Sequence, residues 1–242
     1  MKKVSKHQPV FIFDLDDTLY KEIDFVKSAY RHIDRLLVAD YGTKPREAYK
    51  RLIKSHKDGV NPFDTLNEYL TAKGIIIPDA IEWMVTEYRY HVPSINLEEN
   101  TRLTLDSIRD HEIPMYIITD GRSITQRNKI RALGLTEYIP WENIYISEDE
   151  GRDKLSPMSF RKIRERESCN AMENEFVFVG DNPAKDFVVA NRYGCLSIQL
   201  TDDGRNIHPQ NIQVAKEQKA KRHIRYFKEL NDFVNLYQLK FL

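Results

Sequence analysis

The sequence of 242 residues predicts an α/β protein, in which a doubly wound, mostly parallel β-sheet is joined to an inserted domain of α-helices. Three observations lead to this prediction. Short apolar segments alternate with segments of helical periodicity along most of the chain. The apolar segments are continuous, as is typical of parallel strands that are covered on both faces. The interval between the first two of them is much longer than the roughly 30 residues that one strand–helix–strand unit requires.

Six segments are expected to form the sheet, because they are short and mostly rich in valine, isoleucine, phenylalanine or tyrosine. Four of them are continuous apolar runs, namely Val10–Phe13, Pro114–Ile118, Phe176–Val179 and Leu196–Leu200. Two have a less regular pattern, namely Asn143–Ile146 and Arg222–Phe227. Since helical segments separate them, we expect parallel strands that are joined by right-handed crossovers.

Helical patterns fill the intervals between these strands and follow the last one. The expected helices of the sheet domain are Leu97–His111, Ser123–Leu133, Ser156–Cys169, Ala184–Tyr193 and Glu229–Leu239. The basic segment Gln213–Lys228 is interpreted as a solvated helix face that leads into the last strand. A patch for a polyanion is the less favoured interpretation, because no aromatic stacking pattern accompanies the charges.

The long interval after the first strand predicts a second domain. Its pattern is almost entirely helical, so we assign residues 21–93 to a helical domain and residues 1–20 and 94–242 to the α/β core. Proline at the start of a periodic segment and glycine just after its end are the expected start and stop signals of helices. The expected helices are Asp24–Tyr41, Pro45–Ser55, Phe63–Lys73 and Asp79–Tyr90.

Charge and cysteine content argue against several classes of protein. Lysine plus arginine and aspartate plus glutamate number 37 each, so the formal net charge is zero. Nucleic acids and anionic membranes favour basic partners, so we expect neither. Two cysteines, Cys169 and Cys195, make no disulfide framework, which favours a reducing, cytoplasmic location. The first apolar segment stops at Asp14 and is too short for a signal peptide or a transmembrane helix.

Carboxylates stand where two of the predicted strands end. Asp14 and Asp16 follow the first strand, and Asp181 and Asp186 follow the strand that begins at Phe176. In open α/β sheets, ligands bind at the carboxyl ends of the strands. Each acid alone also fits an ordinary turn or helix cap. On one sheet edge they repel one another unless a cation or a proton relieves the charge, so together they indicate a functional site.

Groups that can bind an anion follow two further strands. Thr119, Asp120 and Gly121 provide a hydroxyl and a glycine turn, and Lys154 precedes the helix that is expected to begin at Ser156. Singly, Thr119 fits a helix N-cap and Lys154 a surface lysine. At the same sheet edge as the carboxylates, they predict a site for a negatively charged group, with Lys154 as its single cation.

In order and spacing, these segments resemble the four motifs of the haloacid dehalogenase-like phosphohydrolase superfamily. The matching segments are Asp14-x-Asp16-x-Thr18, Thr119 with Asp120-Gly121, Lys154, and Gly180-Asp181-x-x-x-x-Asp186. The resemblance covers about Val10 to Leu200, and it implies a Rossmann-like core. The helical insert is similar in place and size to the mobile cap of the first type in that family. Leu155 departs from the pattern, because a proline commonly follows the third-motif lysine.

The resemblance implies a phosphatase that acts through an aspartyl-phosphate. Asp14 would be the nucleophile, and Asp16 the general acid and then the general base. Thr119, the backbone amides of Asp120 and Gly121, and Lys154 would hold the phosphoryl oxygens. The implied cofactor is Mg²⁺, and its implied ligands are the Asp14 carboxylate, the Asp16 backbone carbonyl and Asp181, with Asp186 as a ligand or as a residue that orients bound water.

A helical lid would exclude water and add selecting contacts, so the expected substrate is a small phosphorylated metabolite, either a sugar phosphate or a nucleoside monophosphate. Arg122, Lys57 and Asn61 are candidate substrate contacts. Lys57 and Asn61 lie in a polar segment, 54–61, for which a solvent-facing connector is the favoured interpretation. The sequence indicates no oligomeric state.

Two other functions are consistent with the same motifs. A phosphomutase would use the same aspartyl-phosphate, but its branch usually has glycine and valine in place of Asp17 and Thr18. A non-catalytic phospho-accepting or binding protein would also use an aspartate at a strand end. Receiver domains of that kind have no cap insert, and no motif residue is missing here. The dehalogenase branch generally lacks the second aspartate, so Asp16 favours phosphoester chemistry.

Overall fold

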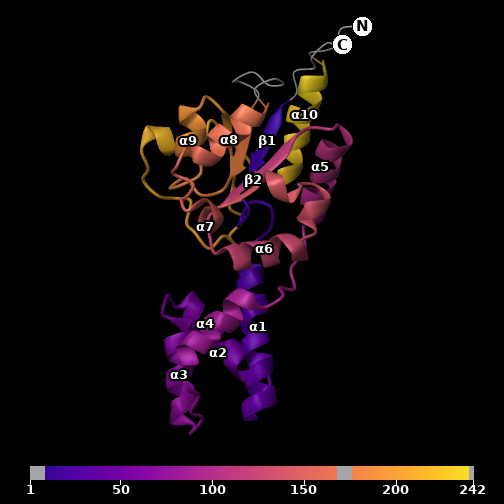
Figure 1. Cartoon of the computed structure of the whole chain (residues 1–242). Coiled ribbons are helices and arrows are strands. Elements are labelled where there is room, and N and C mark those ends of the chain that lie inside the picture. The colour runs from indigo at the N-terminus through magenta and orange to yellow at the C-terminus, as the bar shows by residue number, and fades with distance from the viewer. Residues whose placement is uncertain (1–8, 168–175, 240–242) are drawn as a thin grey trace.

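The computed structural model describes residues 9–167 and 176–239. Its sheet has six strands in the order β3-β2-β1-β4-β5-β6, and every neighbouring pair is parallel (Figure 1). The strands are β1 (Val10–Phe13), β2 (Met115–Thr119), β3 (Ile144–Ile146), β4 (Phe176–Gly180), β5 (Leu196–Leu200) and β6 (Arg222–Ile224). This order is typical of doubly wound sheets, so the predicted fold class is confirmed.

Helices cover both faces of the sheet because successive side chains of a strand point to opposite faces. Phe13 belongs to one hydrophobic core, and its neighbour Ile12 belongs to the other. The first core includes residues of α5 (Glu99–Asp110), α6 (Ser123–Ala132) and α10 (Leu230–Leu239). The second includes residues of α8 (Met158–Glu167) and α9 (Phe187–Arg192). A short helix, α7 (Ser147–Glu150), follows β3.

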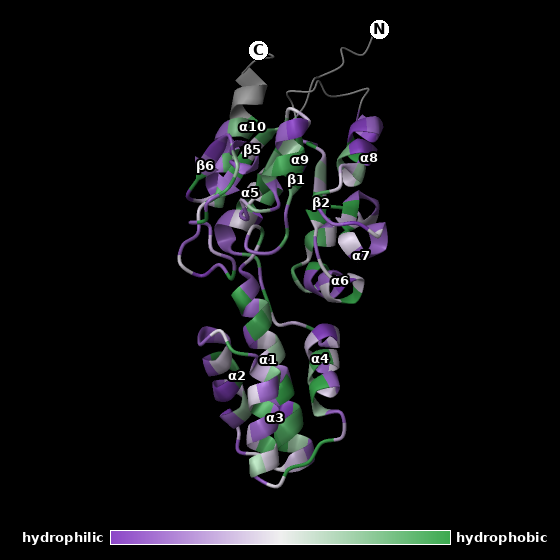
Figure 2. Ribbon diagram, turned by 90° about the vertical axis from the view of Figure 1, so that its left-hand side faces the viewer, coloured by the Kyte–Doolittle hydropathy of each residue, from purple (hydrophilic) through white to green (hydrophobic). Residues whose placement is uncertain are grey.

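Four helices form a unit that stands apart from the sheet (Figure 1). They are α1 (Glu22–Tyr41), α2 (Glu47–Lys57), α3 (Pro62–Ala72) and α4 (Ala80–Tyr90). Apolar residues on their facing sides make a separate hydrophobic core, and Figure 2 shows polar residues on the outer sides. Among the described residues, no helix is long and apolar enough to span a membrane.

The four-helix unit is attached at the carboxyl edge of the sheet. The first chain connection runs from the end of β1 into α1, and the second follows α4. The end of α4 meets α6: the Thr125 hydroxyl donates to the Arg89 carbonyl at 3.3 Å, and the Asn128 amide donates to the Tyr90 carbonyl at 3.2 Å. The connection between α2 and α3 lies at the end of the unit that is nearer the sheet (Figures 1 and 2).

Several predicted boundaries were wrong by two or more residues. The last strand ends at Ile224, because the Glu229 carboxylate accepts the Arg225 and Tyr226 amides and turns the chain into a 3₁₀ helix. Similarly, α9 begins only at Phe187. The turn before it is held by the Asn182 side chain, which accepts the Ala184 amide at 2.9 Å.

The basic segment 213–228 does not form the predicted helix face. It contains a 3₁₀ turn at Lys216–Gln218, strand β6 and the start of the 3₁₀ helix Phe227–Glu229. The polar segment 54–61 is not wholly a loop, because α2 continues to Lys57. The helix predicted to end at Cys169 is described as far as Glu167, and Cys169 lies outside the described residues.

Candidate active site

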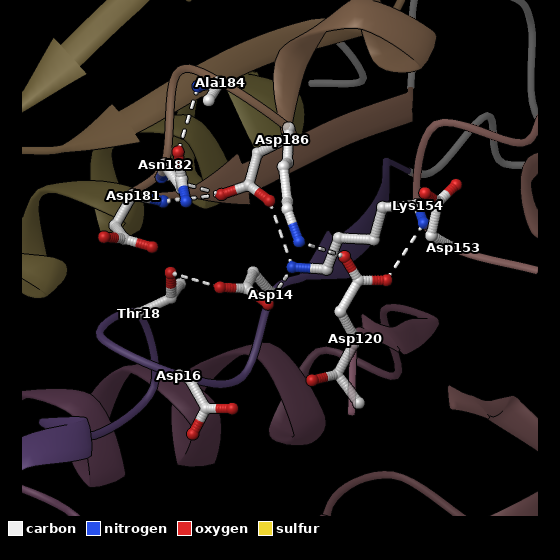
Figure 3. A network of polar contacts seen from close by, with 12 residues as sticks. Asp14, Asp16, Thr18, Asp120, Asp153, Lys154, Asp181, Asn182, Ala184 and Asp186 are labelled. Atoms are coloured by element: carbon white, nitrogen blue, oxygen red, sulfur yellow. Dashed lines mark hydrogen bonds and ion pairs between the residues drawn. The ribbon is translucent and has the colours of Figure 1, made fainter. Parts of the chain in front are cut away.

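Three buried carboxylates meet at the carboxyl edge of the sheet. β1 and β4 are neighbours, with Phe13 opposite Val179, so the residues that follow them come together. Asp14, Asp181 and Asp186 each offer a carboxylate oxygen, and these oxygens lie within 4.8 Å of one another. All three side chains are buried. The structure therefore gathers the carboxylates that the motif spacing had singled out (Figure 3).

Lys154 is buried among these carboxylates. Its ammonium donates to Asp14 and, at 3.0 Å, to Asp186 Oδ1 (Figure 3). Burial raises the pKa of Asp14 to about 8, with Lys154 opposing the rise and Asp186 adding to it. Burial also raises the pKa of Asp181 to about 9, and the Asp14 and Asp186 charges add to that rise. One lysine therefore leaves the negative charge of the cluster only partly compensated.

The donor set fits a hard divalent cation. All three side chains offer carboxylate oxygens, which Mg²⁺ prefers, and their separation allows a single ion to contact them together. Asp16 is outside this set, because its carboxylate points away from that of Asp14 (Figure 3). Its implied part in the site is through the backbone carbonyl, which is compatible with this orientation.

Mg²⁺ is expected to stabilise the protein more at about pH 8 than at about pH 5. The raised pKa values mean that folded Asp14 and Asp181 bind protons that the unfolded chain, with carboxyl pKa values near about 3.9, has already released. Without added metal, the free energy of unfolding therefore falls as the pH rises through this window. At the higher pH a bound cation supplies the positive charge that the released protons no longer supply, so its effect on stability is larger there. Thermal unfolding with and without Mg²⁺ at both pH values measures the effect, and an equal rise in Tm at both would contradict it.

Glycine and Asp186 shape the turn after β4. A Cβ atom on Gly180 would lie 2.5 Å from Asp186 Oδ2, so only glycine leaves room for that carboxylate. The same oxygen accepts the backbone amides of Asp181 and Asn182, at 3.1 and 2.8 Å. Asp186 therefore fixes the loop with one oxygen, while its other oxygen accepts the Lys154 ammonium.

The predicted phosphate-binding residues lie beside the carboxylates. Gly121 has a φ of +146°, which favours glycine, and a Cβ there would meet the Gln126 side chain at 3.0 Å. Gln126 donates to the buried Thr119 hydroxyl at 2.7 Å. The Asp120 carboxylate accepts the Lys154 backbone amide at 3.0 Å and so joins the second and third motifs.

A pocket of about 350 Å³ brings the candidate residues together. Those that line it are Asp14, Asp16, Thr119, Asp120, Gly121, Lys154, Asp181 and Asp186. It is also lined by residues that the motifs did not identify, namely Asp17, Glu22, Asn182, Lys185 and His208. A larger pocket, of about 470 Å³, lies beside Lys21 and Arg225 and contains none of the carboxylate cluster, so the smaller pocket is the candidate active site.

The three candidate substrate contacts do not line this pocket. The Arg122 guanidinium is largely exposed and pairs with Glu148 at 2.6 Å. Asn61 caps α3, because its side chain accepts the Phe63 amide at 3.0 Å. Lys57 ends α2, at the end of the four-helix unit nearer the sheet (Figure 1). The structure therefore gives Arg122 and Asn61 local partners and brings none of the three into the pocket.

Sequence reasoning missed the surroundings of Asp16. Lys129 and Gln126, both from α6, contact its carboxylate, as does Tyr20. The expectation that Lys154 is the single cation at the site was therefore wrong. Gln126 and Lys129 are three residues apart, next to the buried Ile130 of the same helix. Polar residues on the apolar face of a predicted helix were the signal that could have identified them.

The electrostatic state of Asp16 differs from that of Asp14. Burial favours the neutral form of Asp16, but the Lys129 charge and the hydrogen bonds from Lys129, Tyr20 and Gln126 outweigh it and lower the pKa. Asp16 is therefore held ionised, whereas Asp14 depends on further positive charge. Two carboxylates with opposite pKa shifts in one pocket suit different chemical tasks.

Comparison with known proteins agrees with this geometry. A family model described as haloacid dehalogenase-like hydrolase matches residues 11–200. A glyceraldehyde 3-phosphate phosphatase from Methanocaldococcus jannaschii is 30% identical over 196 residues, which are 78% of this chain and 83% of that protein. A ribulose-1,5-bisphosphate 5-phosphatase from Halopiger xanaduensis is 24% identical over 225 residues, covering 92% of this chain and 85% of that protein.

Solved structures show the same fold. The magnesium-bound HAD-hydrolase YfnB from Bacillus subtilis superposes with a TM-score of 0.61 at 21% identity, covering 95% of this chain and 100% of that one. This likeness extends over both the sheet and the four-helix unit. With the motif residues gathered at the carboxyl edge and the family model matching most of the sequence, the chain belongs to the haloacid dehalogenase-like hydrolase family.

Proposed function

We propose that this protein is a Mg²⁺-dependent phosphatase that hydrolyses a small sugar phosphate through an aspartyl-phosphate on Asp14. The observation that supports it most directly is the position of Asp14, which is buried at the end of β1, in contact with Lys154 and in the same pocket as Thr119 and Gly121. A phosphoryl group placed there would meet a nucleophile and several positive or N–H groups at once. The two relatives described above are named as phosphatases of sugar phosphates, which favours sugar phosphates over nucleotides as the substrate class.

The proposed reaction has two steps. An Asp14 carboxylate oxygen attacks phosphorus and the bond from phosphorus to the ester oxygen breaks, while Asp16 gives its proton to the departing oxygen. Asp16 then removes a proton from water, whose oxygen attacks phosphorus; the bond from phosphorus to the Asp14 oxygen breaks, which releases phosphate and restores the Asp14 carboxylate. The proton taken in the second step is the one given in the next first step, so the cycle balances. The lowered pKa of Asp16 favours the ionised form that the second step requires, and Asp16 carries a proton only between that step and the next first step.

The remaining residues of the pocket would bind and orient the phosphoryl group. Lys154 and the Thr119 hydroxyl would contact its oxygens, where negative charge is concentrated. Asp14, Asp181 and Asp186, with the Asp16 carbonyl, would hold Mg²⁺, which when bound supplies positive charge to the carboxylates and to the phosphoryl group. These roles follow from the chemistry of the side chains and their proximity.

The four-helix unit would serve as a lid over this pocket. Its first residue, Glu22, lines the pocket, and its α2–α3 connection lies at the end nearer the sheet (Figure 2). Among the described residues, no hydrogen bond or ion pair engages the Lys57 ammonium at that end, which leaves it available for a substrate anion. Arg122 would become available if Glu148 released it. Asn61 fits a structural role better, because it caps α3.

Phosphate release from a panel of esters tests the proposed function. With Mg²⁺ present, we expect kcat/KM for glyceraldehyde 3-phosphate or another small sugar phosphate to exceed that for nucleoside monophosphates by at least about 10-fold. A chelator should stop the reaction, and added Mg²⁺ should restore it. Absence of phosphate release from every ester would refute the proposal. Isomerisation of a sugar phosphate without release would identify a phosphomutase instead.

A further inference from the structure

Lys129 is a buried lysine whose role the family motifs do not explain. Its side chain is 3% exposed, and its ammonium lies 2.7 Å from Asp16 Oδ1 and 3.4 Å from Glu22 Oε1. The Lys129 ammonium lies over the face of the Phe25 ring, 4.5 Å from the ring centroid. A buried ammonium is costly unless its partners compensate it, and here carboxylates from the β1 loop and from α1 do so together with an aromatic face.

Both oxygens of the Asp16 carboxylate are held by this environment. Oδ1 accepts from Lys129 and, at 2.6 Å, from the Tyr20 hydroxyl. Oδ2 accepts from the Gln126 amide at 2.8 Å, and the same amide donates to the Thr119 hydroxyl. The orientation of Asp16 is therefore fixed by donors from α6 and from its own loop.

Lys129 itself does not line the active-site pocket, whereas Asp16 does. Lys129 can therefore influence the reacting groups only through a neighbour. We propose that Lys129 is the positioning residue for Asp16: it fixes the carboxylate that moves protons at the phosphoryl group. This inference depends on the proposed function, in which Asp16 is the acid and base.

Two further observations favour positioning over a purely structural role. The Lys129 ammonium is closer to Asp16 than to Glu22, so its shorter contact is with the proposed acid–base residue. Gln126, three residues earlier on α6, contacts the same carboxylate and also Thr119. One face of α6 thus links the proposed acid–base residue to the proposed phosphate-binding threonine.

The test combines Lys129→Met with Asp16→Asn and measures hydrolysis of 4-nitrophenyl phosphate with Mg²⁺. We expect Lys129→Met alone to lower kcat by about 10²-fold and to change KM by less than about threefold. The expected loss in kcat is the size that a misplacement of about 1 Å of a reacting group causes. In the Asp16→Asn background, Lys129→Met should change kcat by less than about twofold, because the group that it positions is already lost. Lys129→Gln, which keeps an N–H donor, should lose less activity than Lys129→Met.

Two further proteins control the experiment. Lys162→Met removes the same charge from an exposed lysine that pairs with Glu150, and it should leave kcat unchanged. If Lys129→Met does not fold, the double variant Lys129→Met with Glu22→Gln is assayed in its place, because it removes one charge of each sign. Thermal unfolding of each variant establishes that the assays are made on folded protein.

The possible results separate the inference from the proposed function. An active wild-type enzyme whose kcat is unchanged or raised by Lys129→Met would overturn the inference and leave the phosphatase intact. So would losses that multiply in the double variant with Asp16→Asn, because they would show that Lys129 acts independently of Asp16. A wild-type protein that hydrolyses no ester would overturn the proposed function, and the inference with it.

Discussion

Replacing Asp14 by asparagine is expected to lower kcat for phosphate release by at least about 10⁴-fold, because the amide cannot form the aspartyl-phosphate. The substitution keeps the shape of the side chain. It also removes a charge from a site where burial raises the pKa of the carboxyl to about 8. The folded protein should therefore persist, and thermal unfolding without Mg²⁺ should give an unchanged or higher Tm. Phosphate release and Tm are measured on the same preparation.

The control for Asp14→Asn is Asp110→Asn, the same chemical change at an exposed residue at the end of α5. This variant should retain wild-type kcat. Substantial phosphate release by Asp14→Asn would contradict the assignment of the nucleophile. Loss of activity together with unfolding of Asp14→Asn would contradict the expected stability, because it would show that the carboxylate is needed for the fold.

Replacing Lys154 by methionine is expected to reduce both activity and stability. The ammonium contacts Asp14 and Asp186, and all three side chains are buried. Its loss leaves two facing carboxylates without their partner, which should lower the free energy of unfolding by about 3–5 kcal/mol. It also removes a charge from the proposed phosphoryl-binding site, so kcat should fall by about 10²- to 10³-fold.

Urea unfolding and steady-state kinetics test the Lys154→Met prediction, with Lys162→Met as the exposed control. Added Mg²⁺ should recover part of the lost stability, because it compensates the same carboxylates, but it should not restore kcat. A variant that is as stable as the wild type would show that Lys154 does not compensate the cluster. Unchanged kcat would remove the lysine from the phosphoryl-binding site.

The inner strands of the sheet could be predicted from sequence because they are buried on both faces. β1, for example, is apolar at each of its positions, so its hydrophobicity marks it without reference to any partner. The ends of elements were harder to predict. α9 begins late because the Asn182 side chain binds a backbone amide, and β6 ends early because Glu229 binds two. Such contacts depend on local side-chain geometry that hydrophobic periodicity does not contain.

The candidate site was predictable where its residues follow strands. Asp14 and Asp181 each follow a parallel strand, and the carboxyl ends of parallel strands lie at one edge of the sheet. The positions of the two residues in the sequence therefore predict that they lie close together. Lys129 and Gln126 reach the same site from within a helix, where the sequence does not show which buried position faces the sheet edge. The substrate contacts were harder still, because Asn61 and Arg122 satisfy local partners that only the folded structure brings near them.

The insertion of the four-helix unit after β1 has a consequence for synthesis on the ribosome. The unit has its own hydrophobic core and is complete by the end of α4, so it can fold while the rest of the sheet is still being made. β1 emerges first, yet it pairs only with β2 and β4, which are translated after the whole unit. Of the described strands, β1 is therefore the one with the longest interval between its own synthesis and that of its partners, and its apolar residues stay unpaired in the nascent chain during that interval.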